Sequence, residues 1–277
     1  MIFTEQIRAR IIRAYVILFY VLAAYKWLTG MWLYQHDPFI FKTRFDGTTW
    51  LFMQTRIHQY LLHQEGGFLL MDILFYSMPI IYFKVYRRAP GQIKLAGFIM
   101  LIVNWFYVQN FTLYPTNSIE GNVGWLLFPV LFMIKDLGSF YYVFQSLRYF
   151  FIYFFASSGF WKMYEGGLFN IGEMSHLLLF QHKEQLVSSP GHWYTGFIYW
   201  LVKNPGLSYI LYLLATLMEL AFVSGFFTRR YDRWLVRIFL VFLVADIIIM
   251  KINYFEVLPF LLTLYYSKYE LPANKTA

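Results

Sequence analysis

The sequence predicts an all-α fold, a polytopic membrane bundle of about eight spanning helices, and three observations support it. Hydrophobic residues make up 59% of the 277 positions and charged residues 14%, against roughly 25% charged residues in an average soluble domain. Apolar runs of the kind that form spanning helices recur from Ile11 to Tyr266. Basic residues gather in the short connections between these runs, as topology-determining charges do. The net charge of +8 therefore does not require a nucleic-acid partner.

A spanning helix requires roughly 20 apolar residues, and the apolar runs are assigned to spans on that basis. The first run has a long apolar core without a convincing cleavage site, which distinguishes it from a secretory signal peptide. Together the runs predict a single transmembrane domain over residues 1–277 without a separate soluble domain. The predicted spans are Ile11–Leu33, Gly67–Phe83, Ile93–Leu113, Val123–Ile134, Phe140–Trp161, Leu207–Phe227, Leu235–Met250 and Phe255–Tyr266.

Basic residues determine the predicted orientation of the spans, because cytoplasmic connections carry an excess of lysine and arginine. With about eight spans, the basic groups and both termini fall on the cytoplasmic side. We expect this arrangement in a bacterial inner membrane, or in the endoplasmic reticulum membrane if the host is eukaryotic. The groups are Arg8, Arg10 and Arg13; Lys84, Arg87, Arg88 and Lys94; Arg229, Arg230, Arg233 and Arg237; and Lys268 and Lys275.

Two segments between the spans are predicted to lie on the outer face. Tyr34–Gly66 has apolar residues at helical spacing beside polar ones, which favours an interfacial helix. The run Leu168–Val187, with the following His192–Lys203, is predicted to be re-entrant or interfacial. Counting that run as a full span would move the arginines at 229–237 to the outside, against the distribution of basic residues.

Ionisable side chains in or beside the predicted spans are the main candidates for a functional site. Each costs at least ~2.5–3.5 kcal/mol to insert, so such groups usually face the bundle interior or water. Most of them lie at a similar depth toward the outer face and come from five different helices, which predicts a polar cavity open to the outside. Arg148 and Lys162 are 14 residues apart, so a continuous helix would carry them on one face. The candidates are Lys26, Asp72, Arg148, Lys162, Glu219, Asp246, Lys251 and Glu256.

A structural interpretation of these charges stays open at the level of sequence. The three lysines lie where a lysine side chain can extend to the membrane interface. Carboxylates have short stems, so a functional site or a buried ion pair is favoured over an exposed position for Glu219 and Asp246. An ion pair between Glu219 and Arg148 would explain both charges by a purely structural role.

The sequence predicts no metal site. His58 and His63 are five residues apart, and His176 and His182 are six apart, and neither spacing is the i, i+4 spacing of a helical metal pair. The chain has no cysteine, which excludes disulfides, thiol redox chemistry and Cys-ligated metal. It also has no glycine-rich nucleotide-binding motif, which argues against nucleotide-driven transport by this chain alone.

The stretch LRYFFIYFFASSGFWKMYEGG resembles the horizontally transferred transmembrane (HTTM) family, which includes the membrane part of vitamin K-dependent gamma-carboxylase. In that family an arginine-bearing helix runs through Tyr-Phe, a small residue and Gly into a lysine, and a Gly-bearing segment and an outer-face helix follow. The likeness at residue level is confined to the region around the lysine. The matching residues are Arg148, Tyr153, Phe154, Ser158, Gly159, Lys162 and Gly167.

The resemblance implies that Lys162 is a base that takes a proton from a reduced, vitamin K-like quinone at a site on the outer face. An amine serves as a base when burial or nearby cations make loss of its proton easier. Glu165, Glu219 and Asp246 would tune the charge of Lys162 as members of the same catalytic set. The family's Asn-His pair corresponds to NSIEGN, where Glu120 stands without a histidine. The expected substrate-binding residues are Arg148, Asp72, Lys26, Lys251, Glu256 and Glu120.

Three functions stay open from the sequence. An enzyme would bind a quinone- or lipid-like substrate and carry out quinol-linked or carboxylase-like chemistry. A non-enzymatic scaffold or partner subunit would hold an exported protein or peptide on the outer surface of Tyr34–Gly66 and Gly167–Gly206. A proton-coupled transporter would use Asp246 and Glu219. In all three cases the lipid bilayer is a partner and nucleic acid is not.

Overall fold

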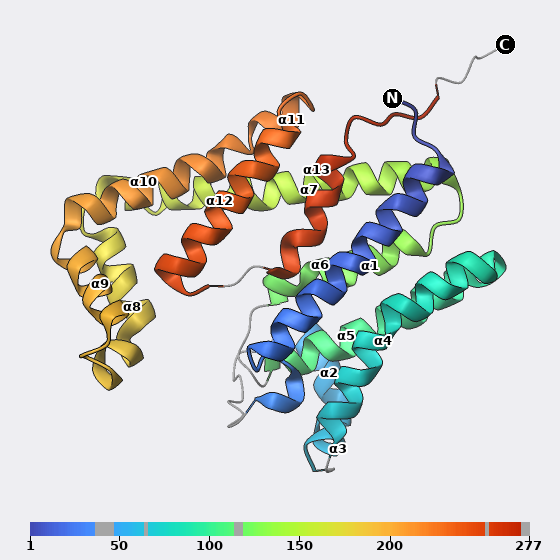
Figure 1. The fold of residues 1–277 in the computed structure, drawn as a ribbon, viewed down its shortest axis with the longest axis horizontal. Helices are drawn as coiled ribbons and strands as arrows, with labels where there is room; N and C mark the ends of the chain where they lie inside the picture. The colour runs from blue at the N-terminus through green and yellow to red at the C-terminus, as the bar shows by residue number, and fades with distance from the viewer. Residues whose placement is uncertain (37–46, 64–65, 114–118, 253–254, 273–277) are drawn as a thin grey trace. The chain divides into compact units, whose positions relative to one another are not determined.

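The computed structural model describes residues 1–36, 47–63, 66–113, 119–252 and 255–272. Its regular secondary structure in these ranges is helical, apart from an isolated parallel bridge between Ile2 and Glu270 (Figure 1). The chain divides into two compact units: unit 1 comprises Met1–Leu147 and Phe255–Ala277, and unit 2 comprises Arg148–Tyr254. The structure confirms the all-α fold class, whereas a single transmembrane domain stays a prediction.

Long apolar helices form most of unit 1, namely α1 (Glu5–Leu28), α4 (Gly67–Arg88) and α5 (Ile93–Leu113). α4 ends just before Ala89, because the residue preceding a proline is disfavoured in the helical conformation. The short 3-10 helix η2 (Pro90–Gln92) then leads into α5. The other elements of unit 1 are η1 (Leu33–Gln35), α2 (Gly47–Gln54), α3 (Ile57–His63), α6 (Ile119–Phe132), the first part of α7 (Leu137–Tyr164), η4 (Phe255–Phe260) and α13 (Leu261–Tyr265).

Aromatic rings fill the core of unit 1. The rings of Phe75 on α4 and Tyr107 on α5 stack with their centroids 3.8 Å apart. The ring of Phe19 on α1 meets Trp125 on α6 edge-on, with 4.8 Å between centroids. Such pairs contribute about 0.5–1.5 kcal/mol each beyond the area that they bury. Part of the high aromatic content therefore serves helix packing inside the unit.

Gly124 allows α6 to approach η4 closely. A Cβ atom at this position would lie 2.5 Å from the backbone carbonyl oxygen of Glu256. We expect Gly124→Ala to lower the free energy of unfolding by about 1–3 kcal/mol, because backbone cannot move aside as a flexible side chain does. Thermal unfolding of the protein in detergent measures the loss. Gly196→Ala is the matched control, since a Cβ there has no neighbour within 4 Å, and equal effects of the two changes would contradict the prediction.

Unit 2 contains the second part of α7, a two-helix hairpin and two further long helices. After α7, Gly166 adopts a φ of 77°, the left-handed conformation in which glycine commonly follows a helix. The hairpin consists of α8 (Glu173–Ser188) and α9 (Trp193–Lys203), and α10 (Pro205–Ala221) begins with proline, whose fixed φ suits the first helical position. The other elements are η3 (Gly167–Phe169), α11 (Ser224–Phe227) and α12 (Asp232–Met250).

Among the described residues, four helical segments are long and apolar enough to cross a membrane, which supports an integral membrane protein. Two further predicted spans coincide with α6 and with η4 and α13, which are apolar but shorter. The remaining two coincide with α7 and α12, which carry more polar and charged residues. A count of eight spans and the orientation in the membrane therefore stay predictions. The four segments are Glu5–Gln35, Gly67–Arg88, Pro90–Leu113 and Pro205–Phe227.

The interfacial helix predicted within Tyr34–Gly66 is interrupted in the structure. α2 and α3 are separate helices, and Arg56 between them adopts a φ of 55°, in the left-handed region that breaks a helix. Residues 37–46 and 64–65 of this segment lie outside the described residues. The run Leu168–Val187 forms η3 and then α8, and its depth in the membrane stays a prediction.

Candidate functional site

Lys162 forms an ion pair with a carboxylate from a neighbouring helix. Its Nζ lies 2.8 Å from Oε1 of Glu219 on α10, and the hydroxyl group of Ser158 on α7 donates to the same oxygen at 3.0 Å. The side chain of Glu219 is 4% exposed and that of Lys162 is 26% exposed. The other oxygen of Glu219, Oε2, is buried and has no hydrogen-bond partner among the described residues. The pair therefore joins a partly exposed lysine side chain to a buried carboxylate, one oxygen of which can accept a further hydrogen bond.

Two glycines allow α7 and the turn after it to approach α10. A Cβ atom on Gly159 would lie 3.2 Å from the Cβ of Glu219, and one on Gly167 would lie 2.3 Å from the hydroxyl oxygen of Tyr212. The Nζ of Lys162 lies 5.6 Å from the ring centroid of Tyr212, within the range of cation–π attraction. Close packing thus holds the ammonium between a carboxylate and an aromatic ring.

Asp246 on α12 is the third ionisable member of this cluster. Its carboxylate is half-buried and interacts electrostatically with Lys162 and Glu219. Glu165, by contrast, is exposed in the turn after α7 and forms no ion pair with Lys162 in the part of the chain that the structure describes. The structure thus brings together three residues of the predicted catalytic set, from α7, α10 and α12. When all three are ionised, one ammonium faces two carboxylates.

Arg148 pairs with Asp232, so the predicted structural pair Glu219–Arg148 is wrong. Nε and Nη2 of Arg148 donate to the two carboxylate oxygens of Asp232 at 2.7 and 2.6 Å, and Nη2 also donates to the carbonyl of Gly225 at 2.9 Å. Both side chains are fully buried. α7 is continuous as predicted, but its rise separates Arg148 from Lys162 by about 21 Å along the axis. Asp232 starts α12 at the level of Arg148, whereas Glu219 lies at the level of Lys162.

Three of the predicted substrate-binding residues form a second cluster, within unit 1. Lys26 on α1 forms an ion pair with Glu256 on η4, and both side chains are almost completely buried. The Nζ of Lys26 also lies 4.6 Å from the ring centroid of Phe111. Asp72 on α4 accepts two backbone N–H groups of η1 at 3.1 and 2.9 Å. These contacts fix η1 and η4 to the long helices of unit 1, and a substrate-binding role for the cluster stays a prediction.

The two remaining predicted substrate-binding residues are Lys251 and Glu120. Lys251 follows α12 and donates to the side-chain oxygen of Gln185 on α8, and its Nζ lies 4.5 Å from the ring centroid of Tyr194 on α9. Burial raises the pKa of the Tyr194 hydroxyl. Lys251 therefore ties the α8–α9 hairpin to α12. Glu120 belongs to the first turn of α6, and its side chain lies outside the described residues.

Two histidines of the hairpin, His182 on α8 and His192 before α9, make structural contacts. The ring of His182 shares a hydrogen bond of 2.8 Å with the carbonyl of Ile249. His192 precedes α9, and its Nδ1 accepts the backbone N–H of Tyr194 at 3.2 Å. Within the described ranges, no three His, Asp or Glu residues are grouped so as to hold a metal ion.

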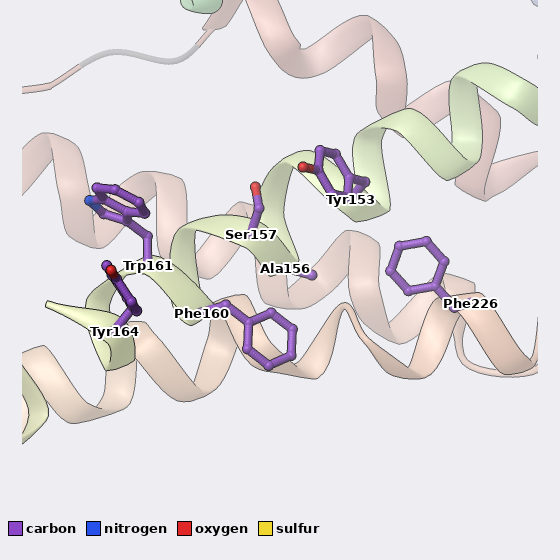
Figure 2. A pocket seen from close by; sticks show the side chains of 7 residues that line it. All are labelled: Tyr153, Ala156, Ser157, Phe160, Trp161, Tyr164 and Phe226. Atoms are coloured by element: carbon purple, nitrogen blue, oxygen red, sulfur yellow. The ribbon is translucent and has the colours of Figure 1, made fainter. Parts of the chain in front are cut away.

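An apolar hollow of about 340 Å³ lies along α7 on the side away from Lys162. Figure 2 shows side chains from successive turns of α7 lining it, with Phe226 of α11 beside them. Tyr153, at one end of the hollow, is nine residues from Lys162, which is half a turn out of phase on a helix. This hollow is therefore not the predicted polar cavity. Its lining is Tyr153, Ala156, Ser157, Phe160, Trp161, Tyr164 and Phe226.

A second hollow, of about 140 Å³, lies between α4 and α5 and is also mainly apolar. It is lined from α4 by Met78, Ile81 and Val85. Like the first, it contains none of the predicted site residues. The polar cavity open to the outer face therefore stays a prediction.

Sequence reasoning missed two side chains that organise these sites. Asp232 lies among four arginines, so the sequence suggests only a basic connection with one acidic residue. Ser158 appeared only as a small residue of the family pattern, although it lies four residues before Lys162 and hence on the same helix face. The four-residue spacing could have indicated that Ser158 lies beside Lys162. No spacing or motif in the sequence indicates that Asp232 pairs with Arg148.

No family model, curated protein or solved structure matches the chain. The functional interpretation therefore depends on the geometry of the clusters and on the residues around Lys162. The resemblance to the HTTM family stays a prediction.

Proposed function

We propose that this chain is a multi-pass membrane protein that binds a quinone- or lipid-like substrate at the cluster of Lys162, Glu219 and Asp246 and exchanges a proton with a substrate hydroxyl group. The observation that carries the proposal is the surplus of carboxyl groups: Lys162 interacts with both Glu219 and Asp246, and Oε2 of Glu219 is buried without a partner among the described residues. An uncompensated buried charge is unfavourable. The cluster therefore favours a ligand that brings a hydrogen-bond donor.

The cluster can supply a base in two proton transfers. In the first, the Lys162 ammonium gives a proton to a neighbouring carboxylate, which leaves a neutral amine and a carboxylic acid. In the second, the amine takes the proton of the substrate hydroxyl group, which yields a substrate anion and restores the ammonium. The ammonium then stabilises the anion electrostatically. Lys162 is thus the base that the HTTM resemblance implies, and Glu219 or Asp246 stores the proton.

The position of the cluster suits a substrate dissolved in the membrane. Glu219 belongs to the candidate span Pro205–Phe227, and ionisable groups retained in a span usually have a functional or pairing role. The Lys162 side chain is 26% exposed, so part of this side chain is accessible to a ligand. A reduced quinone combines an apolar body with an acidic hydroxyl group, which is the chemistry that such a site requires.

Ligand binding tests the proposal directly. The full-length protein in phosphatidylcholine vesicles is titrated with menaquinol, and binding is followed by quenching of its tryptophan fluorescence. We expect saturable binding that Glu219→Gln weakens at least about tenfold, because hydrogen bonds to charged groups contribute about 1.5–3 kcal/mol. Glu184→Gln is the matched control, since Glu184 is exposed on α8. Absence of saturable binding, or equal affinity of all three proteins, would rule out the quinol proposal.

A membrane scaffold or partner subunit is the second candidate function. It is favoured by the exposed apolar side chains on η3 and the α8–α9 hairpin, among them Phe169, Phe180, Val187 and Trp193. Contiguous exposed apolar surface marks contacts with a protein or a membrane. Crosslinking in native membranes followed by affinity purification tests this function. Recovery of this chain without a partner protein would count against it.

A further inference from the structure

The turn between α11 and α12 concentrates positive charge. Residues 227–237 contain four arginines and one acidic residue, Asp232. Asp232 is fully buried, and both of its carboxylate oxygens accept hydrogen bonds from Arg148. The only acidic side chain of the segment is therefore turned inward and neutralised by an arginine from α7. Among the four arginines of the turn, Arg230 and Arg237 are exposed, and the segment contains no second acidic residue.

Exposed aromatic side chains lie in the same segment. Phe227 is 84% exposed and Trp234 is 58% exposed, and Tyr231 is exposed as well. The guanidinium carbon of Arg237 lies 4.6 Å from the ring centroid of Trp234, and that of Arg230 lies 5.9 Å from the ring centroid of Tyr231. Stacking engages the face of a guanidinium group, whereas its N–H donors lie in its plane and match a phosphate. The aromatic neighbours therefore orient the arginines without consuming their donors.

The segment begins where a candidate span ends. Pro205–Phe227 is long and apolar enough to cross a membrane, and Arg229 follows it after one residue. If this span crosses a bilayer, the arginines lie at the level of the lipid headgroups, where amphipathic aromatic residues are also enriched. The N-terminus of α12, which starts at Asp232, adds the favourable end of a helix dipole for an anion.

We propose that residues 227–237 form a binding site for the phosphate headgroup of anionic phospholipids, which we call the basic corner. Arg230 and Arg237 bind the phosphate, Arg233 adds positive charge beside them, and Phe227 and Trp234 pack against the glycerol and upper acyl region. Zwitterionic lipids bind less well, because their headgroup carries a positive charge beside the phosphate. The proposal depends on the membrane assignment of Pro205–Phe227 and not on the chemistry at Lys162.

A lipid-quenching experiment tests the basic corner. The full-length protein is placed in phosphatidylcholine vesicles with a small fraction of brominated phosphatidylglycerol or brominated phosphatidylcholine, and tryptophan quenching gives the relative association constant of the two lipids. We expect preference for phosphatidylglycerol, lost at least about tenfold in the triple variant Arg230→Gln, Arg233→Gln, Arg237→Gln. Trp234→Phe should remove most of the selective quenching if this tryptophan reports the site.

A second triple variant separates a local site from net charge. Lys84→Gln, Arg87→Gln, Arg88→Gln removes the same charge from the end of α4, where the neighbouring aromatic side chains are only partly exposed, and it should keep the lipid preference. Equal losses in both triple variants, or no preference in the unaltered protein, would overturn the proposal. If the first triple variant does not fold, Arg237→Gln alone should still reduce the preference. Displacement of the lipid by millimolar glycerol phosphate would show a site for soluble phosphate instead and would overturn the assignment to lipid.

Discussion

Replacing Asp232 by alanine is expected to lower the free energy of unfolding by about 3–5 kcal/mol, because it leaves a buried guanidinium without its counter-charge. Arg148 and Asp232 are both fully buried, and two hydrogen bonds of 2.6 and 2.7 Å join them. The bidentate geometry is the one in which an arginine–carboxylate pair is strongest. Arg148 also donates to the carbonyl of Gly225, so the pair holds α11 as well as the start of α12 against α7.

Thermal unfolding in detergent measures this effect, and two variants provide controls. Glu5→Ala removes a largely exposed carboxylate 3.4 Å from Arg8. Arg8 keeps its hydrogen bonds to the carbonyls of residues 134 and 135, so we expect a loss of at most about 1 kcal/mol. The double variant Arg148→Met, Asp232→Leu removes both charges, and it should be more stable than Asp232→Ala because no unpaired charge remains. A loss below about 1 kcal/mol for Asp232→Ala would show that water or another group reaches the guanidinium and compensates it.

Helix positions could be predicted from the sequence because apolar composition is a local property. The span predicted at Ile93–Leu113 coincides with α5 at both ends, and the span predicted to begin at Gly67 coincides with the start of α4. α1 begins at Glu5, before the predicted span. Its first turns contain Arg8, which is buried and donates to the carbonyls of residues 134 and 135. The sequence alone does not distinguish an arginine that binds the carbonyls at the end of another helix from one that lies at the cytoplasmic membrane surface and sets the topology.

Partner choice among the charges could not be predicted, because it depends on the register between helices that are far apart in sequence. The 14-residue spacing correctly indicated that Arg148 and Lys162 share a face of one helix, but it does not tell which carboxylate lies beside each. The structure pairs Lys162 with Glu219, 57 residues away, and Arg148 with Asp232, 84 residues away. The antiparallel course of α10 beside α7 sets this register, and Gly159 permits the approach.

Lys162→Met is expected to reduce the rate of proton transfer from a bound quinol by about 10²–10⁴-fold, the usual contribution of a positioned general acid or base. Methionine preserves the apolar stem of the side chain and removes the amine. Glu219 accepts hydrogen bonds from two described donors, Lys162 and Ser158, and the substitution leaves only the Ser158 hydroxyl. Oxygen-dependent oxidation of menaquinol by the protein in vesicles measures the rate, because the quinol anion reacts with oxygen faster than the neutral quinol does.

The comparison with Lys183→Met separates a role in chemistry from a general effect of charge. Lys183 is exposed on α8, and its Nζ lies 5.0 Å from the ring centroid of Phe180. It is thus a lysine near an aromatic ring, and it forms no ion pair with a carboxylate of the described residues. Its replacement should leave the rate unchanged. Lys162→Arg is more discriminating, since arginine keeps the ion pair with Glu219 but cannot lose its proton. If Lys162 acts as a base, the arginine variant folds normally and loses the rate. If Lys162 only anchors α7 at the membrane interface, Lys162→Arg retains the full rate and Lys162→Met loses stability rather than activity.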